Sequence, residues 1–122
     1  MSEEKINVMV LKRDGLGDAM ARSLNLVGRA DDILFRGTSS EQEAIDAFNS
    51  GEVSVVVSGI FGINWQRVAE SVGKENLIVF SALSGMSEER EVIEAGITSV
   101  PMDLKTGNEN LFAAIRRTAT RQ

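Results

Sequence analysis

The chain has 122 residues, which suffices for one domain with its own hydrophobic core. Its 18 acidic and 13 basic residues give a formal net charge of −5, which argues against nucleic-acid binding because phosphate contacts need a clustered excess of Lys and Arg. Cysteine and histidine are both absent, which excludes disulfides, thiol chemistry, phosphohistidine transfer and the most common zinc ligand and general base.

The N-terminal segment shows no signal for export or membrane insertion. Met1–Lys5 is charged, and the apolar run that follows, Ile6–Leu11, is too short for a signal peptide or a membrane span. We therefore expect residues 1–122 to form one soluble, cytoplasmic domain that contacts neither a membrane nor nucleic acid and needs no metal or other cofactor.

Apolar runs of strand length alternate with segments of helical period along the whole chain. One run, Val53–Val57, is almost continuously apolar, as expected at the centre of a sheet covered on both faces. The last contains the only proline, Pro101, which suits a sheet edge or a strand end. The five predicted strands are Ile6–Leu11, Asp32–Phe35, Val53–Val57, Leu77–Phe80 and Ile97–Met102.

Between and after these runs, apolar residues recur at helical spacing, and a glycine ends four of the five predicted helices. Ser40-x-x-Glu43 has the form of a capping box, and Ser87 and Asn108 are expected to cap the last two helices. This (βα)5 order predicts an α/β fold with a doubly wound, five-stranded parallel sheet. The predicted inward faces are Leu16, Ala19, Met20, Ser23, Leu24 and Val27; Ala44, Ile45, Ala47 and Phe48; Trp65, Val68, Ala69 and Val72; Val92, Ile93 and Ala95; and Leu111, Phe112 and Ile115.

The segment Asn76–Leu83 reads as a strand that ends in Ser81 followed by Ala82, and Glu94–Ala95–Gly96 leads into the fifth strand. Together with the length and the element order, these segments resemble the receiver domains of response regulators over nearly the whole chain. The resemblance implies a receiver-type, flavodoxin-like sheet in the strand order 2-1-3-4-5, with its functional residues at the carboxyl ends of the strands.

The chemistry of a receiver needs five side chains. Two acids after the first strand hold Mg²⁺, an Asp at the end of the third accepts the phosphoryl group, and a Thr/Ser after the fourth and a Lys after the fifth hold its oxygens. The resemblance places these positions, in that order, on Lys12 and Arg13, on Ser58 or Gly59, on Ser81 and on Asp103.

Four of these five positions therefore lack the family's side chain. Lys12 and Arg13 would repel Mg²⁺ rather than bind it, and only Asp14, just beyond them, is acidic. We predict a pseudo-receiver: a non-enzymatic, non-phosphorylatable signalling and regulatory domain. Val8–Leu11 and Val55–Phe61 also resemble the receiver-like half of amide-responsive transcription antitermination regulators, which works by protein contact.

A second hypothesis is a sensor that binds an anion at Lys12, Arg13 and Ser81, since Gly15-x-Gly17 follows the two cations at the start of a helix. The simpler interpretation is that the cations pair with neighbouring acids and that Ser81 bonds to the backbone. Because Lys12 and Asp103 exchange the signs that a receiver has at these positions, we also expect a salt bridge between Asp103 and the Lys12–Arg13 pair.

The resemblance implies that a partner protein or a second copy docks on the fourth helix, fifth strand and fifth helix. Glu88 and Glu91 on the fourth helix and Arg116 and Arg117 on the fifth offer opposite charges for such a contact. The alternative is that these charged residues only form solvated helix faces.

Overall fold

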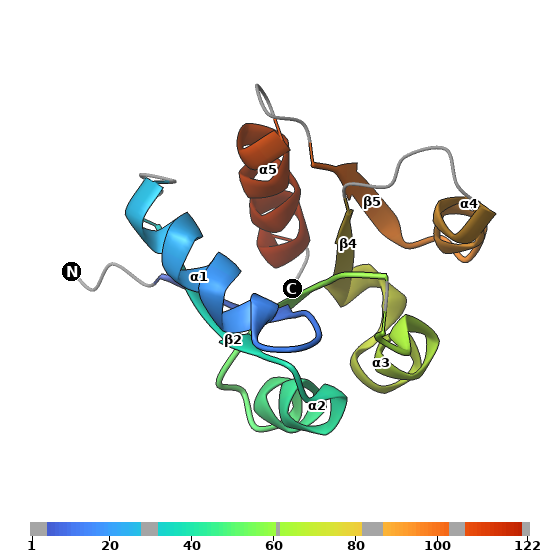
Figure 1. Cartoon of the computed structure of the whole chain (residues 1–122), viewed down its shortest axis with the longest axis horizontal. Helices are drawn as coiled ribbons and strands as arrows, with labels where there is room; N and C mark the ends of the chain where they lie inside the picture. Colours follow the sequence, from blue (N-terminus) through green and yellow to red (C-terminus); the bar gives the residue numbers. More distant parts are fainter. Residues whose placement is uncertain (1–4, 28–31, 61, 82–86, 103–106, 121–122) are drawn as a thin grey trace.

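In the computed structural model, the strands form one parallel sheet with helices on both of its faces (Figure 1). The structure describes residues 5–27, 32–60, 62–81, 87–102 and 107–120. The strands lie in the order β2-β1-β3-β4-β5, and this confirms the predicted fold class and strand order. They are β1 (Ile6–Leu11), β2 (Ile33–Thr38), β3 (Val55–Ser58), β4 (Leu77–Ser81) and β5 (Thr98–Pro101).

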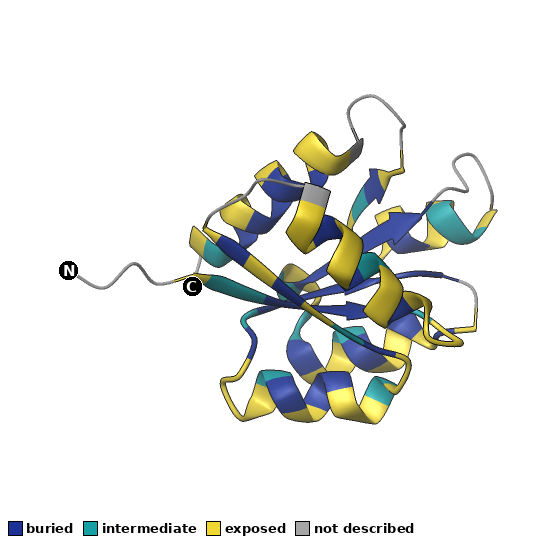
Figure 2. Ribbon diagram, turned by 60° about the vertical axis from the view of Figure 1, so that its left-hand side comes forward, coloured by how far each residue is buried: buried dark blue, intermediate teal, exposed yellow. Residues whose placement is uncertain are grey.

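Two hydrophobic clusters lie on opposite faces of the sheet because successive strand residues point in opposite directions. Val8 and Val10 of β1 belong to the cluster under α1 and α5, whereas Met9 and Leu11 belong to the cluster under α2, α3 and α4. Figure 2 shows the resulting pattern of buried strands and helices with one buried face. The helices are α1 (Leu16–Val27), α2 (Glu41–Asn49), α3 (Trp65–Val72), the 3-10 turn η1 (Lys74–Asn76), α4 (Ser87–Glu94) and α5 (Gly107–Thr120).

The predicted boundaries differ from the observed ones by a few residues. Strand β2 continues to Thr38, whereas β3 begins only at Val55. The Ser40 hydroxyl accepts a hydrogen bond from the Glu43 backbone N–H at 3.1 Å, as the predicted N-cap requires. The predicted caps Ser87 and Asn108 instead lie inside α4 and α5.

The inward face of α1 differs from the predicted stripe. Leu16 is 54% exposed, whereas Gly17, Ala21 and Leu24 are buried. A Cβ at Gly17 would lie 2.4 and 2.6 Å from carbonyl oxygens of β2 and β1, so the helix packs its glycine directly on the strand ends. A search for apolar periodicity misses this contact because glycine contributes no hydrophobic signal.

The fourth helix also differs from its prediction, since only part of its expected apolar face is buried. Val92 is fully buried, but Ile93 is 57% exposed and Ala95 is exposed as well. Ile93 lies about 100° round the helix from Val92, and Ala95 lies on the other side of Val92. No helix in the described ranges is long and apolar enough to cross a membrane.

Candidate functional site

Lys12 reaches across the carboxyl edge of the sheet. It directly follows β1, and its ammonium Nζ donates a hydrogen bond to the Phe80 carbonyl oxygen of β4 at 3.3 Å. Strand β3 lies between β1 and β4. A Cβ at Gly59, just after β3, would lie 3.2 Å from the Lys12 Nζ and 3.3 Å from its Cγ. The lysine side chain therefore lies over Gly59 and links the ends of three strands.

The position of the ammonium disfavours its positive charge. Burial lowers the pKa of Lys12, because loss of water disfavours the charged form. The ion pairs formed within the described ranges do not include this lysine. Asp103, its predicted partner, lies outside the described residues. Within the described part of the chain, the Phe80 carbonyl is thus the group that compensates the lysine charge.

Arg13 lies at the surface of the same edge. Its Cδ is 2.6 Å from the position that a Cβ at Gly62 would take, so the chain packs across the loop after β3. Its Nε lies 3.8 Å from an Asp14 carboxylate oxygen, and the two side chains are 57% and 82% exposed. Such an exposed pair is worth little in water. Asp14 (φ 56°) and Gly15 (φ 76°) both adopt left-handed backbone conformations and turn the chain into α1.

The two serines of the predicted site lie inside the fold. Ser58 is fully buried, and its hydroxyl donates a hydrogen bond to the Gly59 carbonyl oxygen at 2.7 Å. Ser81, which follows Phe80 at the end of β4, is 7% exposed and takes part in a polar contact of its own. The structure thus brings Lys12, Gly59 and the end of β4 together. No cluster of three or more acidic residues that could hold a metal ion occurs among the described residues.

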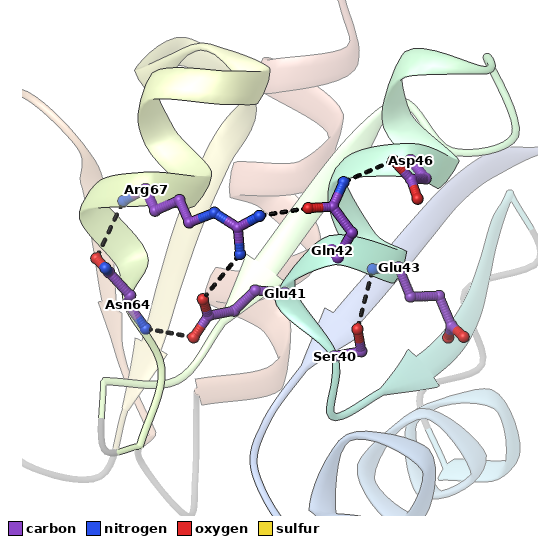
Figure 3. A network of polar contacts seen from close by, with 7 residues as sticks. All are labelled: Ser40, Glu41, Gln42, Glu43, Asp46, Asn64 and Arg67. Atoms are coloured by element: carbon purple, nitrogen blue, oxygen red, sulfur yellow. Dashed lines mark hydrogen bonds and ion pairs between the residues drawn. The ribbon is translucent and has the colours of Figure 1, made fainter.

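A polar network beside this edge was not predicted from the sequence (Figure 3). The Glu41 carboxylate at the start of α2 accepts hydrogen bonds from the Asn64 backbone N–H at 2.8 Å and from the Arg67 guanidinium at 3.4 Å. The Asn64 side-chain oxygen in turn accepts from the Arg67 backbone N–H at 3.1 Å and caps α3. Arg67 also bonds to the Gln42 amide oxygen. The network joins the start of α2 to the start of α3.

The residues expected at a docking surface lie on different flanks of their helices. Arg116 donates two hydrogen bonds to the Asp32 carboxylate, at 2.8 and 2.9 Å, just before β2. Arg117 instead lines an open cleft of about 250 Å³ between β5 and α5. Glu88 and Glu91 lie on one flank of α4, and Ala95, just after the helix, lies on the same flank, because residues three and four apart in a helix are neighbours. This flank faces α3.

Comparisons with known proteins identify the fold. No family model matches the sequence, and no curated protein is similar to it. Similar solved structures include the receiver domain of the Francisella response regulator 1452, with 17% identity, coverage of 96% of this chain and 98% of that chain, and a TM-score of 0.69.

A receiver domain from a Pseudomonas fluorescens Pf-5 protein that contains an HD domain is 13% identical, covers 97% of both chains and has a TM-score of 0.69. The response-regulator domain of Thermotoga maritima CheB is 15% identical, with coverage of 96% of this chain and 98% of that chain and a TM-score of 0.66. At these identities the similarity establishes the fold alone. The chain has the receiver fold of response regulators.

Proposed function

We propose that this chain is a pseudo-receiver, a signalling domain that acts through protein contacts and is not switched by aspartyl phosphorylation. The observation that carries the proposal is the position of Lys12, whose ammonium lies over Gly59 and bonds to the end of β4. Gly59, just after β3, is one of the two residues that match the family's phosphoacceptor. A lysine chain fills the space above it.

The electrostatics support the same proposal. Attack of a carboxylate on a phosphoryl group builds up negative charge, which receivers offset with Mg²⁺ held by acids. Lys12 and Arg13 stand where those acids would be, and their charges oppose metal binding. Ser58 is no substitute nucleophile, because it is fully buried and its hydroxyl donates to a backbone carbonyl.

The docking surface that we propose is the β5 edge with the adjoining flanks of α4 and α5. Three features support it: Ile93 is 57% exposed, Met102 is 36% exposed, and Arg117 lines the open cleft beside β5. Exposed apolar residues and a cation along one edge suit a protein surface that offers apolar and acidic side chains. Either a partner protein or a second copy of this chain would fit there.

The test of the phosphorylation proposal is a titration with beryllofluoride and Mg²⁺, followed by thermal unfolding and by the emission of Trp65. We expect neither readout to change, because the chain lacks the acceptor and the acid pair. The NtrC receiver domain, whose solved structure is described as beryllofluoride-activated, is the positive control for the reagent under the same conditions. A stoichiometric, Mg²⁺-dependent shift in the melting temperature of this chain would contradict the proposal.

A second candidate function is anion sensing at the same edge. It is favoured by Lys12, a partly buried cation that forms no ion pair among the described residues. Arg13 lies at the surface beside it. Thermal unfolding with inorganic phosphate, nucleotides and phosphorylated metabolites tests it. A saturable stabilisation that Lys12→Met abolishes would support the sensor, and an unchanged melting temperature throughout would reject it.

A further inference from the structure

A second hollow lies on the face of the molecule that α2, α3 and α4 cover, away from the Lys12 edge. It is a groove of about 320 Å³ between α3 and the turn that joins α4 to β5. Its floor is apolar and consists of Trp65, Ala69, Ala95 and Ile97. Its volume is at the lower end of the range of small-molecule sites.

The groove exists because two small side chains face each other across it. Ala69 of α3 is only partly buried and Ala95 is exposed, so neither fills the space between the two elements. Below them Trp65 and Ile97 are 6% and 4% exposed, and they belong to the hydrophobic core on this face. A ligand in the groove would therefore contact a rigid, preformed apolar surface rather than a mobile one.

A cation lies at the rim of this apolar floor. The Nζ of Lys74, from η1, is 3.4 Å from the position that a Cβ at Gly96 would take, so its chain extends across the turn after α4. Within the described structure, Lys74 forms no ion pair with a carboxylate. Glu70 also lines the groove, and the ion pairs among the described residues do not join it to Lys74.

We propose that the groove binds a small amphiphilic acid, one ring system or short apolar chain that carries a single anionic group. The apolar part packs on Trp65 and Ile97 between the two alanines, and the anion pairs with Lys74. Burial of apolar surface provides the binding free energy, while the ammonium selects anions over neutral analogues. This proposal is independent of the pseudo-receiver proposal, because none of these residues belongs to the Lys12 edge.

The chain provides its own probe for the test, because Trp65 is the only tryptophan and tyrosine is absent. The two ligands are 8-anilinonaphthalene-1-sulfonate, an anion, and N-phenyl-1-naphthylamine, a neutral compound with nearly the same rings. Titration of the full chain with each, followed by Trp65 emission, gives two dissociation constants. We expect saturable quenching by both compounds, with the anion bound more tightly.

Three variants locate the site. Ala95→Leu fills the groove, and we expect it to weaken both compounds by about tenfold or more, as loss of one well-packed ring face would do. Ala19→Leu, a matched control at an exposed alanine of α1, should change neither constant. Lys74→Gln should weaken the sulfonate by about threefold and leave the neutral compound unchanged, as loss of one exposed ion pair would do.

Several outcomes would overturn the proposal. One is the absence of saturable quenching up to millimolar concentrations. Another is an Ala95→Leu variant that binds like the parent chain, or an Ala19→Leu variant that loses binding to the same extent. If Lys74→Gln affects both compounds equally, the groove has no preference for acids and the proposed ligand class is wrong. Equal urea midpoints for the parent and the alanine variants ensure that folding does not explain the differences.

Discussion

The two edge strands of the sheet, β2 and β5, differ in how their outer edges are covered. At β2 the side chain of Asn25 from α1 donates to the Phe35 carbonyl oxygen at 2.9 Å and accepts from the Phe35 N–H at 3.0 Å. The amide thereby acts like one residue of an additional strand. At the opposite edge, β5 borders an open cleft against α5, and its last residue is Pro101, which has no N–H to donate.

The difference indicates where the molecule resists contact and where it permits it. Exposed edge strands pair readily with other chains, so proteins cover or interrupt them. Two interactions cover the β2 edge. One is the hydrogen bonding of Asn25, and the other is the Arg116–Asp32 ion pair that joins α5 to the start of β2. The β5 edge instead borders an open cleft lined by residues of β5 and α5. This contrast supports our placing the docking surface at β5.

The largest expected effect of a single change is at the contact between α1 and β2. A Cβ at Gly37 would lie 2.3 Å from backbone atoms of Asp18 and Gly17, so Gly37→Ala must push the helix away from the edge. We expect a loss of about 3 kcal/mol in the free energy of unfolding, measured with urea. The control is Gly51→Ala, where a Cβ has free space and only the positive φ opposes it. It should cost about 1 kcal/mol. Equal losses would contradict the close-packing explanation.

Removal of the amide at β2 comes next in size. Asn25→Ala leaves the Phe35 N–H and carbonyl without their side-chain partner in a partly buried position, and we expect a loss of about 2 kcal/mol by the same measurement. Asn25→Asp should restore only part of it, because a carboxylate accepts from the N–H but repels the carbonyl oxygen. Ser23→Ala, at an exposed residue of the same helix, should stay within about 0.5 kcal/mol of the parent chain.

The Arg116–Asp32 pair should give a smaller and pH-dependent effect. The hydrogen bond from Arg116 lowers the pKa of Asp32 below its ordinary value of 3.8. The pair therefore stabilises the fold above the carboxyl range, and its contribution is lost as the pH falls through the lowered pKa. Both side chains are about half exposed, so solvent screens them and Arg116→Ala should cost only about 0.5 kcal/mol at pH 7.

Urea unfolding of this variant and the parent at a series of pH values checks the linkage. The two curves should converge in acid, when Asp32 is protonated in both. Arg117→Ala, at the open edge, should match the parent chain at every pH. A constant difference between Arg116→Ala and the parent down to the lowest pH would show that the arginine stabilises by packing rather than by charge.

The smallest effect on stability, but the one that most directly tests the comparison of the edges, is charge reversal at Arg117. Because this residue lines the cleft beside β5, Arg117→Glu should weaken self-association or partner binding without changing the urea midpoint. Sedimentation velocity of concentrated protein, or titration with a partner, measures it. Arg36→Glu, a reversal on the closed strand β2, is the comparison. A greater loss of association in Arg36→Glu than in Arg117→Glu would mean that the docking surface is at β2 and not at β5.

The amino-acid sequence was a good guide to the strands and a poor one to the contacts between elements. The apolar runs of β1 and β3 are local signals, and both strands form close to where they were predicted. Contacts through glycine or through backbone carry no such signal. The hydrogen bond from Lys12 ends on a carbonyl oxygen 68 residues away, and the ion pair of Arg67 with Glu41 spans 26 residues.

Helix flanks could not be assigned for the same reason. Arg116 and Arg117 are adjacent in sequence but point about 100° apart, so one reaches β2 and the other β5. The sequence predicts both as one basic patch, and the direction of each follows only once α5 is docked on the sheet. Ile93 presents the same problem, since an apolar residue beside a buried one reads as part of the same face.

Lys12 gives the carboxyl edge of the sheet a tethered occupant. The fraction of molecules with a bound ion or phosphoryl group at such a position would depend on the concentration of that group in solution. A side chain attached to β1 is instead always present at a high effective concentration. The link between the ends of β1 and β4 therefore follows no binding isotherm. Its occupancy depends on temperature and on the protonation of a single amine, so dilution of the medium cannot release it.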